Sequence, residues 1–572
     1  MDPLEPDACH RLPLLRLLVR GREQIGRYCA RFIFDLHQDD DCYTRPRGQS
    51  MRVFVTLLLC AGALHAQGGG QVQFRDWHAP AATQKPKVSC ESLRALTSYD
   101  VSIISATTIA ATADVPEHCR VSLMIPPEIN IEVNMPAAWN GRFYMFGNGG
   151  FAGESFQAPG RIRNRALGLK AGFAVAATDQ GHSAAKEPSA TFARNRQKLL
   201  DYGFRSLHLT AETAKMLLRT YYGDAASKSY FEGCSQGGRE GLIFAERFPT
   251  DFDGIVAGSP AIDFTGGNLA RAYLLQGLAA TPIPAAKLKL LADTEYAKCD
   301  AADGLQDGLV SDPLHCDFHA DRDLAQCANG VDGADCFLPS EITAINLIHS
   351  DVMSQGKRIF PGWPVGAVAF AIKPGEQDPQ SGWVGEELNY ADGRPGAWKY
   401  YADGFLGDIA FPEGDPASTV AGFNIDRDSG RVAESRAILD ATDPNLTAFH
   451  QHNGKLIMYF GWADPQLNPR QGVEYYDKVA ETMGTSTGDF ARLYMVPGMF
   501  HCGGGIGTNV FDAMTPLINW VESGTAPDQI TSSRVVDGKV VRTRPLCPYP
   551  QLARYKGTGS IDDDANFACV RP

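Results

Sequence analysis

The chain has 572 residues, of which 44% are hydrophobic and 21% are charged, a composition typical of a globular protein with room for two domain-sized cores. Its formal net charge is −13 at pH 7, from 53 Lys and Arg against 66 Asp and Glu. This balance disfavours a nucleic acid or an anionic membrane as a partner, because either would need a basic face. We expect a small or neutral partner instead.

An apolar run near the N-terminus has the pattern of a secretory signal peptide. Met51 and a single arginine precede the apolar residues 53–63, and the small residue Ala66 closes the run. The run is too short for a membrane span, which needs about 20 apolar residues. A buried helix is the alternative, but the GGGQ that follows ends the pattern abruptly. We therefore expect a secreted or periplasmic protein with a signal peptide at 51–66 and a non-native upstream extension at 1–50.

Ten cysteines follow the expected cleavage point, and an even number in an oxidising compartment predicts five disulfides. Ten cysteines alone do not fix the connectivity. Pairing by proximity along the chain gives Cys90–Cys119, Cys299–Cys316, Cys327–Cys336 and Cys547–Cys569. Cys234 and Cys502 are then left over.

From about residue 120 the chain alternates apolar runs typical of strands with segments of helical pattern. The runs RFYMFG (142–147), GFAVAATD (172–179) and SYFEGCS (229–235) predict strands, and LHLTAETAKMLLRTYYG (207–223) predicts a helix. This order implies an α/β fold with a parallel sheet covered by helices.

The alternation breaks off at about residue 263 and returns in KLIMYFGWADP, residues 455–465. We interpret residues 264–445 as an insertion into a core made of 67–263 and 446–572. An insertion that leaves near the carboxyl ends of the core strands, where α/β sheets bind ligands, would form a lid.

The segment YFEGCSQGGREGLIFAERFP has the order strand, sharp turn, helix, which is the context that a G-x-S-x-G nucleophile motif requires. The turn would expose Ser235 as a nucleophile. It would also leave the main-chain amide of Gln236 at a helix N-terminus, where an amide can stabilise an oxyanion. A glycine-rich turn without chemistry matches the same pentapeptide, so the motif needs partners.

Such folds place their catalytic residues in the order Ser, acid, His. Asp464 follows the strand-like GKLIMYFG, and His501 follows the strand-like ARLYMV. Either one alone could be an ordinary loop residue, but three residues at strand ends in this order predict a triad. Asp179 and His182 are a rival acid and base, but both precede Ser235, so we interpret them as structural.

Cys234 precedes Ser235 and Cys502 follows His501, and both cysteines were unpaired above. We expect them to form a disulfide that ties the nucleophile turn to the histidine loop. This tie would help to hold the site to within about 0.5 Å, as catalysis demands. Cys234 as the nucleophile is the rival interpretation, but an oxidising compartment disfavours a free thiolate.

The motifs GCSQGGREG, GWADP and HCGG resemble those of the tannase and feruloyl esterase family, and the resemblance covers residues 80–572. It implies an α/β-hydrolase core with an inserted lid, a disulfide between the cysteines beside Ser and His, and hydrolysis of phenolic acid esters such as feruloyl or galloyl esters. Hydrolysis of terephthalate monoesters is the alternative activity in this family. A non-catalytic, calcium-stabilised binding protein on the same scaffold is the alternative outside catalysis. No redox cofactor is implied.

The stretch FGNGGFAG, residues 146–153, is rich in glycine at the end of a predicted strand. It lacks the Lys and Ser or Thr of a phosphate-binding loop. By analogy with the family, Gly149 or Gly150 supplies the second oxyanion amide, and we favour Gly150. A tight turn without this role would look the same.

The stretch CDAADGLQDGLVSDPLHC, residues 299–316, carries three aspartates spaced by glycines. Converging carboxylates repel one another unless a cation such as Ca²⁺, which prefers six to eight oxygen ligands, binds between them. A solvated acidic loop is the alternative. The family resemblance implies a structural calcium site in the lid, with the carboxylates and carbonyl oxygens of Asp300, Asp303, Leu305, Asp307 and Leu309.

Aromatic residues of the lid could sandwich a phenolic ring, although aromatics fill cores as readily as they form pocket walls. The candidates are Trp383, Trp398, Tyr400, Tyr401 and Phe405. A terephthalate-like substrate would also need a cation for its free carboxylate, for which Lys399 or Arg394 are the candidates. The sequence does not indicate an oligomeric state.

Overall fold

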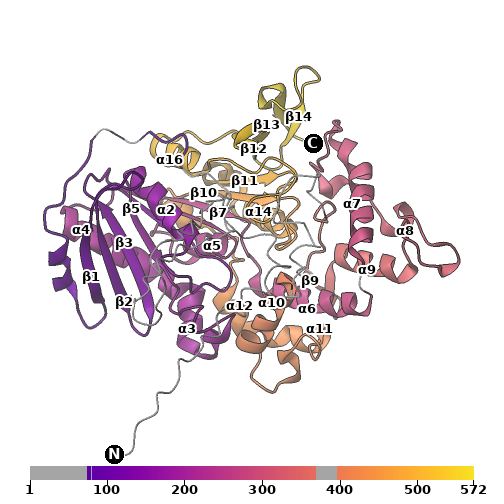
Figure 1. The fold of residues 1–572 in the computed structure, drawn as a ribbon, viewed down its shortest axis with the longest axis horizontal. Helices are drawn as coiled ribbons and strands as arrows, with labels where there is room; N and C mark the ends of the chain where they lie inside the picture. The colour runs from indigo at the N-terminus through magenta and orange to yellow at the C-terminus, as the bar shows by residue number, and fades with distance from the viewer. Residues whose placement is uncertain (1–73, 79, 81, 282, 369–395) are drawn as a thin grey trace, which may run out of the picture. The chain divides into compact units, whose positions relative to one another are not determined.

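A nine-stranded central sheet has the spatial order β1-β2-β3-β5-β4-β6-β7-β10-β11 (Figure 1). The structure is a computed structural model that describes residues 74–78, 80, 82–281, 283–368 and 396–572. The expected signal peptide, the upstream extension, Trp383 and Arg394 lie outside the described residues.

The first three strands along the sheet are antiparallel, and the strands from β5 to β11 run parallel to one another. Every residue of β5 and β7 is buried, as expected for parallel strands with helices on both faces. The strands are β1 (Ser102–Ile109), β2 (His118–Ile125), β3 (Ile129–Pro136), β4 (Arg142–Phe146), β5 (Ala174–Thr178), β6 (Lys228–Cys234), β7 (Gly254–Gly258), β10 (Lys455–Gly461) and β11 (Ala491–Val496).

Alternate side chains of β4 point to opposite faces of this sheet, as the period of a strand requires. Phe143 and Met145 pack in a core with α4, α5 and α14, whereas Tyr144 and Phe146 pack in a second core with α2 and α16. The sheet therefore has a helical layer on each face. These helices are α2 (Pro159–Lys170), α4 (Ser206–Tyr222), α5 (Gln236–Arg247), α14 (Arg470–Met483) and α16 (Met514–Ser523).

Helix α4 follows the predicted helical segment closely. Leu207, Ala211, Ala214 and Leu218 are buried, and their spacing of three and four residues puts them on one face of the helix. The helix ends at Gly223, whose φ of 75° is the left-handed conformation that glycine adopts most easily at a helix C-terminus.

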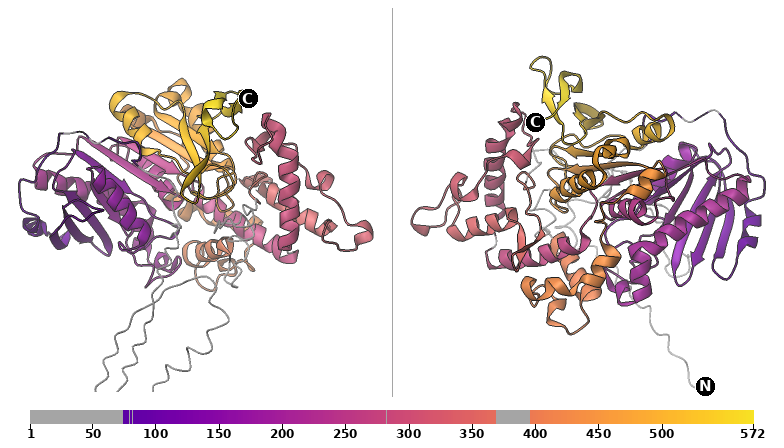
Figure 2. Two further views of the ribbon diagram at one scale, coloured as in Figure 1. Left: turned by 45° about the horizontal axis from the view of Figure 1, so that its top comes forward. Right: turned by 180° about the vertical axis from the view of Figure 1, so that it is seen from behind.

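The segment between β7 and β10 contains mostly helices, where the sequence predicted a lid (Figure 2). Its first helix begins at Phe264 because the Asp263 carboxylate caps it, accepting a hydrogen bond from the Gly266 amide at 2.7 Å. The elements are α6 (Phe264–Ala280), α7 (Ala285–Cys299), α8 (Ala320–Asp323), α9 (Pro339–His349), β8 (Val352–Ser354), β9 (Lys357–Phe360), α10 (Ala397–Gly404), α11 (Ile425–Asp428), α12 (Ala433–Leu439) and α13 (Thr447–Gln451).

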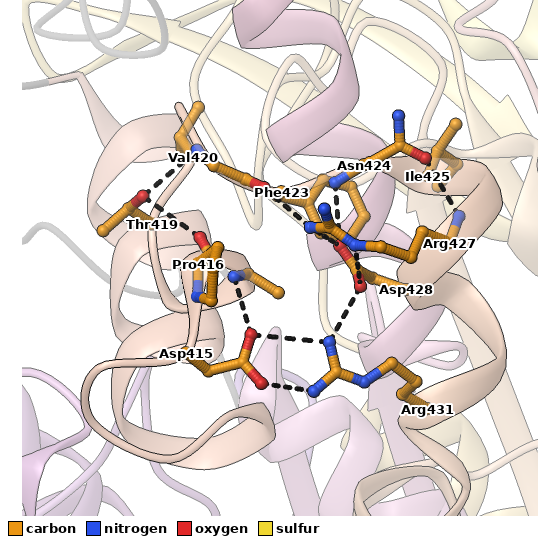
Figure 3. Close-up of polar contacts among 12 residues, drawn as sticks. Asp415, Pro416, Thr419, Val420, Phe423, Asn424, Ile425, Arg427, Asp428 and Arg431 are labelled. Carbon is orange, nitrogen blue, oxygen red and sulfur yellow. Dashed lines mark hydrogen bonds and ion pairs between the residues drawn. The ribbon is translucent and has the colours of Figure 1, made fainter.

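A charged network holds the lid segment between α10 and α12 (Figure 3). Arg431 lies 2.8 Å from the Asp428 carboxylate and also pairs with Asp415. Arg427 lies 2.7 Å from the same buried carboxylate, which accepts the Asn424 amide at 2.9 Å as well. Burial on its own would raise the pKa of Asp428, but these hydrogen bonds outweigh it and lower the pKa to about 2.

The same segment is attached to α6. The side-chain amide of Gln276 donates to the carbonyl oxygens of Val420 at 2.6 Å and Phe423 at 2.7 Å. These two residues lie beside the charged network in Figure 3. The network therefore braces the helix whose other end lies beside the nucleophile.

Two small hairpins follow the sheet, and Cys547–Cys569 connects them. Their strands are β12 (Ile530–Val536), β13 (Lys539–Leu546), β14 (Leu552–Tyr555) and β15 (Phe567–Val570). The short helices α3 (Arg196–Leu200) and α15 (Thr487–Phe490) complete the described core. Within the described residues, no helix has both the length and the apolar character to cross a membrane.

Candidate active site

Ser235 lies in the sharp turn between β6 and α5. Its φ of 63° and ψ of −120° are unusual for a residue with a side chain, and its amide donates to the Gly258 carbonyl at 2.9 Å. A Cβ at Gly233 would lie 2.6 Å from the carbonyl carbon of Gly237, so the turn can close only with glycine there. The predicted nucleophile motif thus has the backbone geometry that exposes its serine.

Asp464 and His501 meet at the carboxyl ends of β10 and β11. The Nδ1 atom of His501 is 2.8 Å from the Oδ2 atom of Asp464, whose side chain is fully buried. The other Asp464 oxygen accepts the amides of Gln466 at 2.9 Å and Leu467 at 2.8 Å, which fix the carboxylate. Because Nδ1 donates its proton to this carboxylate, Nε2 is left as the acceptor that a general base needs.

A disulfide joins the nucleophile turn to the histidine loop. Cys234 and Cys502 are bonded, with Cα atoms 6.0 Å apart, across a sequence separation of 268 residues. The Cys502 sulfur lies 3.8 Å from Nε2 of His501. The bond therefore fixes the neighbours of Ser235 and His501 to each other. All five expected pairs are bonded in the structure.

The two expected oxyanion donors line the same cavity as Ser235. Gln236 is the first residue of α5, so its main-chain amide has no partner within the helix. Gly150 follows β4 with a φ of 52°, and its carbonyl accepts a hydrogen bond from the Tyr202 hydroxyl at 2.9 Å. Both residues therefore lie in the wall of the cavity that contains Ser235, and their role as oxyanion donors stays a prediction.

This cavity is a cleft that is open to solvent and lies between the sheet and the lid. Its aromatic walls are Phe264, Phe360, Trp363 and Tyr401. Its polar lining includes Asp263, Asn268, Arg271, Gln466, Asn468 and Gln471. An aromatic ring could lie against these walls with its ester carbonyl at Ser235.

The sequence of the chain is also similar to those of known proteins. A family model described as "Tannase and feruloyl esterase" matches residues 113–570. The chain belongs to this family. Mono(2-hydroxyethyl) terephthalate hydrolase of Piscinibacter sakaiensis is 38% identical over 528 residues, which cover 82% of this chain and 87% of that protein. A probable feruloyl esterase B-2 of Aspergillus terreus is 28% identical over 500 residues, covering 81% of this chain and 88% of that one.

The crystal structure of feruloyl esterase B from Aspergillus oryzae has a TM-score of 0.73 to this structure at 26% identity, covering 84% of this chain and 99% of that one. The predicted family and the predicted α/β-hydrolase fold are therefore confirmed. As a member of the tannase and feruloyl esterase family, the chain is a carboxylic ester hydrolase.

Only one of the described aromatic residues proposed for the pocket lines it, namely Tyr401. Trp398 and Phe405 are fully buried behind the wall, where Trp398 packs on Trp363 at 4.9 Å between ring centroids. Tyr400 is 44% exposed and lies outside the lining. The lid-core interpretation thus describes Trp398 and Phe405 better than a role in substrate contact.

The positively charged residue that lines the cavity is also not one of the two expected for a substrate carboxylate. Lys399 pairs with Asp403 one turn along α10 and does not line the cavity. Arg271 of α6 does, and it donates to the side chain of Asn268 at 3.0 Å and to the Gln466 carbonyl at 2.6 Å. Asn268 and Arg271 are three residues apart on α6, a spacing that places both on one face and could have marked them in the sequence.

Asp179 and His182 contact residues 147–153, the loop that carries Gly150 and the expected oxyanion amide (the oxyanion loop). Asp179 accepts the side-chain amide of Asn130 at 2.7 Å, and burial raises the pKa of Asp179 to about 6. His182 is buried, stacks on Phe192 at 3.9 Å and lies 3.1 Å from the Phe151 carbonyl. These contacts support the loop, in agreement with the structural interpretation of this pair.

The acidic loop closed by Cys299–Cys316 folds back on itself. Asp300 accepts the amides of Asp307 at 3.0 Å and Gly308 at 3.1 Å, and Asp303 accepts the amide of Leu305 at 2.9 Å. Four of the five expected calcium ligands line a second cavity, namely Asp303, Leu305, Asp307 and Leu309.

Two observations favour a cation in this loop. The Oδ1 atom of Asp307 is buried without a hydrogen-bond partner, and burial together with the charges of Asp307 and Asp300 raises the pKa of Asp303. Against this, Arg544 of β13 lies 2.5 Å from the other Asp307 oxygen. Among the described residues, no three acidic, His or Cys side chains are arranged to hold a metal ion. The calcium site therefore remains a prediction.

Proposed function

We propose that this esterase is a serine enzyme that hydrolyses esters of aromatic acids. Ser235 attacks the ester carbonyl, His501 accepts its proton, and Asp464 orients the imidazole. The main-chain amides of Gln236 and Gly150 bind the oxyanion. One observation carries the proposal. His501, which pairs with Asp464, is held near Ser235 by the Cys234–Cys502 disulfide, and Ser235 lines a cleft with aromatic walls.

The chemistry follows from these positions. The Asp464 carboxylate keeps the proton of His501 on Nδ1, so Nε2 takes the proton of the serine hydroxyl as the carbon–oxygen bond forms. The same nitrogen then returns the proton to the leaving alcohol. A water molecule repeats the two steps on the acyl-enzyme and releases the acid. The amides stabilise the negative charge of both tetrahedral intermediates.

The shape of the cleft supports an aromatic acyl group. Phe264, Trp363 and Tyr401 come from different elements, yet all line the cleft together with Ser235. Flat aromatic walls favour a flat ring through stacking and through the burial of apolar area. Feruloyl and galloyl esters carry such a ring, and the similar proteins include a probable feruloyl esterase.

A second candidate function is the hydrolysis of terephthalate monoesters. Two observations favour it: a relative that is 38% identical bears the name mono(2-hydroxyethyl) terephthalate hydrolase, and Arg271 lines the cleft. A guanidinium group binds a carboxylate with two parallel hydrogen bonds, so it could recognise the free acid of such a substrate.

A substrate panel tests the proposal and separates the two candidates. We would compare kcat/KM for methyl ferulate, methyl gallate, a terephthalate monoester and a short aliphatic ester, each with wild type and Ser235→Ala. The proposal predicts that an aromatic ester is the best substrate and that Ser235→Ala abolishes its turnover. If the aliphatic ester won by more than about tenfold, or about 1.4 kcal/mol, the aromatic pocket would be wrong. Equal rates for the wild type and Ser235→Ala would contradict the serine enzyme and leave the binding protein.

We also propose that the protein is secreted or periplasmic, which its five disulfides support.

We further propose a structural Ca²⁺ held by the carboxylates of Asp300, Asp303 and Asp307 and the carbonyls of Leu305 and Leu309. Bound Ca²⁺ would supply the positive charge that these carboxylates need. Chelation should lower the Tm of the wild type, since an ion that binds only the folded state stabilises it. Asp303→Asn should lose this shift, and the exposed Asp335→Asn should keep it. Wild type without bound calcium and without a shift would contradict the site.

A further inference from the structure

The loop that carries Gly150 rests directly on the helix that carries Gln236. A Cβ at Gly147 would lie 2.7 Å from Cα of Gly237, and a Cβ at Gly237 would lie 3.1 Å from the carbonyl oxygen of Asn148. The two backbones are therefore as close as two glycines allow. The first residues of the oxyanion loop have no freedom to approach α5 further, but nothing in this contact stops them from moving away.

Asn148 supplies the missing attachment. Its side chain is buried, and its Nδ2 atom donates to the two carboxylate oxygens of Glu240 at 3.1 and 3.3 Å. Glu240 is fully buried on α5, four residues after Gln236 and so one turn along the same face. The side chain of Asn148, together with its main chain, which also hydrogen-bonds Glu240, therefore connects the loop to the turn of helix that presents the other oxyanion amide.

The other end of the Asn148 amide is also held. Its Oδ1 atom accepts a hydrogen bond from Arg161 of α2. Arg161 is only 4% exposed, and it donates to the Thr178 carbonyl at the end of β5 at 2.7 Å and pairs with Glu154 at 3.1 Å. The guanidinium is thus fixed by the sheet. It binds the oxygen of the Asn148 side chain, whereas Glu240 binds the nitrogen.

An asparagine suits this place, because it offers a donor to a carboxylate and an acceptor to a guanidinium at once. An aspartate would set two carboxylates against each other, and an alanine would remove both bonds and leave Glu240 and Arg161 buried without them. Such buried groups are costly unless they are paired, so the three side chains hold one another in place. Burial raises the pKa of Glu240 to about 7, against the opposing effects of Arg239 and Asn148.

We propose that Asn148, held between Glu240 and Arg161, is a positioning residue that sets the spacing of the two oxyanion amides. Gly150 lies two residues beyond Asn148, and Gln236 lies one helical turn before Glu240. Oxyanion donors act only within about 2.7–3.1 Å of the developing charge, so a small shift of this loop weakens them. This inference rests on the proposed serine mechanism and adds to it the part that holds Gly150 in place.

The test compares Asn148→Ala and Glu240→Gln with Glu246→Gln, using a p-nitrophenyl ester of an aromatic acid. Glu246 lies on the same helix, and its side chain accepts a hydrogen bond from the Tyr475 hydroxyl at 3.2 Å, so it controls for a Glu-to-Gln replacement on α5 away from Asn148. Active sites are counted by fluorophosphonate titration, so that kcat refers to folded enzyme only. The affinity of a boronic acid, which forms a tetrahedral adduct, is measured beside that of the free aromatic acid.

We expect Asn148→Ala to lower kcat per active site by about 10- to 100-fold, less than the 10²–10³-fold seen when an oxyanion donor is removed altogether. KM and the affinity of the free acid should change less than about twofold, and the boronic acid should lose affinity in proportion to kcat. Glu240→Gln should lose about three- to tenfold, because an amide oxygen still accepts the Asn148 bond. Glu246→Gln should keep kcat within about twofold.

Unchanged kcat per active site in Asn148→Ala would overturn the inference, as would equal losses of affinity for the boronic acid and the free acid. If Asn148→Ala does not fold, Glu240→Gln decides the question by the same criteria. These outcomes differ from a failure of the proposed mechanism, in which the wild type itself would show no turnover that depends on Ser235.

Discussion

The sheet side of the cleft and the lid side differ in how their residues are fixed. Ser235, Asp464 and His501 each follow the carboxyl end of a strand, so the order of strands in the sheet brings them together. The lid residues Phe264 and Trp363 are held by packing among helices and loops. The chemistry therefore depends on backbone geometry that tolerates little change, whereas specificity depends on packed side chains that can vary without loss of the fold.

The largest effect is expected on the sheet side. Asp464→Asn should lower kcat by about 10⁴-fold for every ester alike, because an amide can no longer fix His501 in the tautomer that leaves Nε2 as acceptor. The measurement is kcat for an aromatic and an aliphatic ester. A loss for only one of the two esters would contradict the division between chemistry and specificity.

The disulfide beside the triad should give the next largest effect. Replacing Cys234 and Cys502 by alanine should lower kcat by about 10- to 100-fold at temperatures where the variant is folded, because the nucleophile turn and the histidine loop lose their link. The same change at Cys327 and Cys336, which close a loop with a sequence separation of 9 residues in the lid, is the control and should leave kcat unchanged. Equal effects of the two double variants would mean that the link serves stability alone.

On the lid side, Arg271→Gln should change the choice of substrate more than the rate. If the enzyme accepts a terephthalate monoester, this variant should lower kcat/KM for it by about tenfold or more relative to methyl ferulate, since a neutral amide binds a carboxylate more weakly than a guanidinium does. Lys399→Gln is the matched control, because Lys399 lies outside the lining. A parallel loss for both substrates would assign Arg271 to the support of the Gln466 loop instead.

The smallest effect should be on stability, through the charged network of the lid. Arg431→Leu should lower the free energy of unfolding slightly at neutral pH, because the buried Asp428 loses one of its partners. The pKa of Asp428 is about 2 in the folded chain, below the ordinary 3.8, so this contribution is present above pH 4 and is lost as the pH falls towards 2. The unfolding curves of wild type and variant should therefore converge at low pH. At neutral pH, the variant should keep the kcat of the wild type. A gap that persists at pH 2 would assign the effect to packing rather than charge.

The same contrast explains how far the sequence predicts the structure. The His501–Asp464 pair, the disulfides and the turn at Ser235 were predictable, because each is marked by a short motif beside a strand or by a cysteine count. Trp363 and Phe360 were missed, because only the folding of the lid brings them to Ser235. The Arg544–Asp307 pair joins residues 237 positions apart, and the Asn148–Glu240 pair joins residues 92 apart. Neither contact leaves a local pattern that spacing or composition could reveal.

The most direct test of the account is to label the native protein with a fluorophosphonate and to map the peptides of a non-reduced digest by mass spectrometry. The account predicts one adduct per chain, on Ser235, in a peptide that is linked to its partner through Cys234 and Cys502. Ser235→Ala should carry no adduct. Label on another residue, or a Cys234 thiol that alkylates in the native protein, would contradict the assignment of Ser235 as the nucleophile beside a structural disulfide.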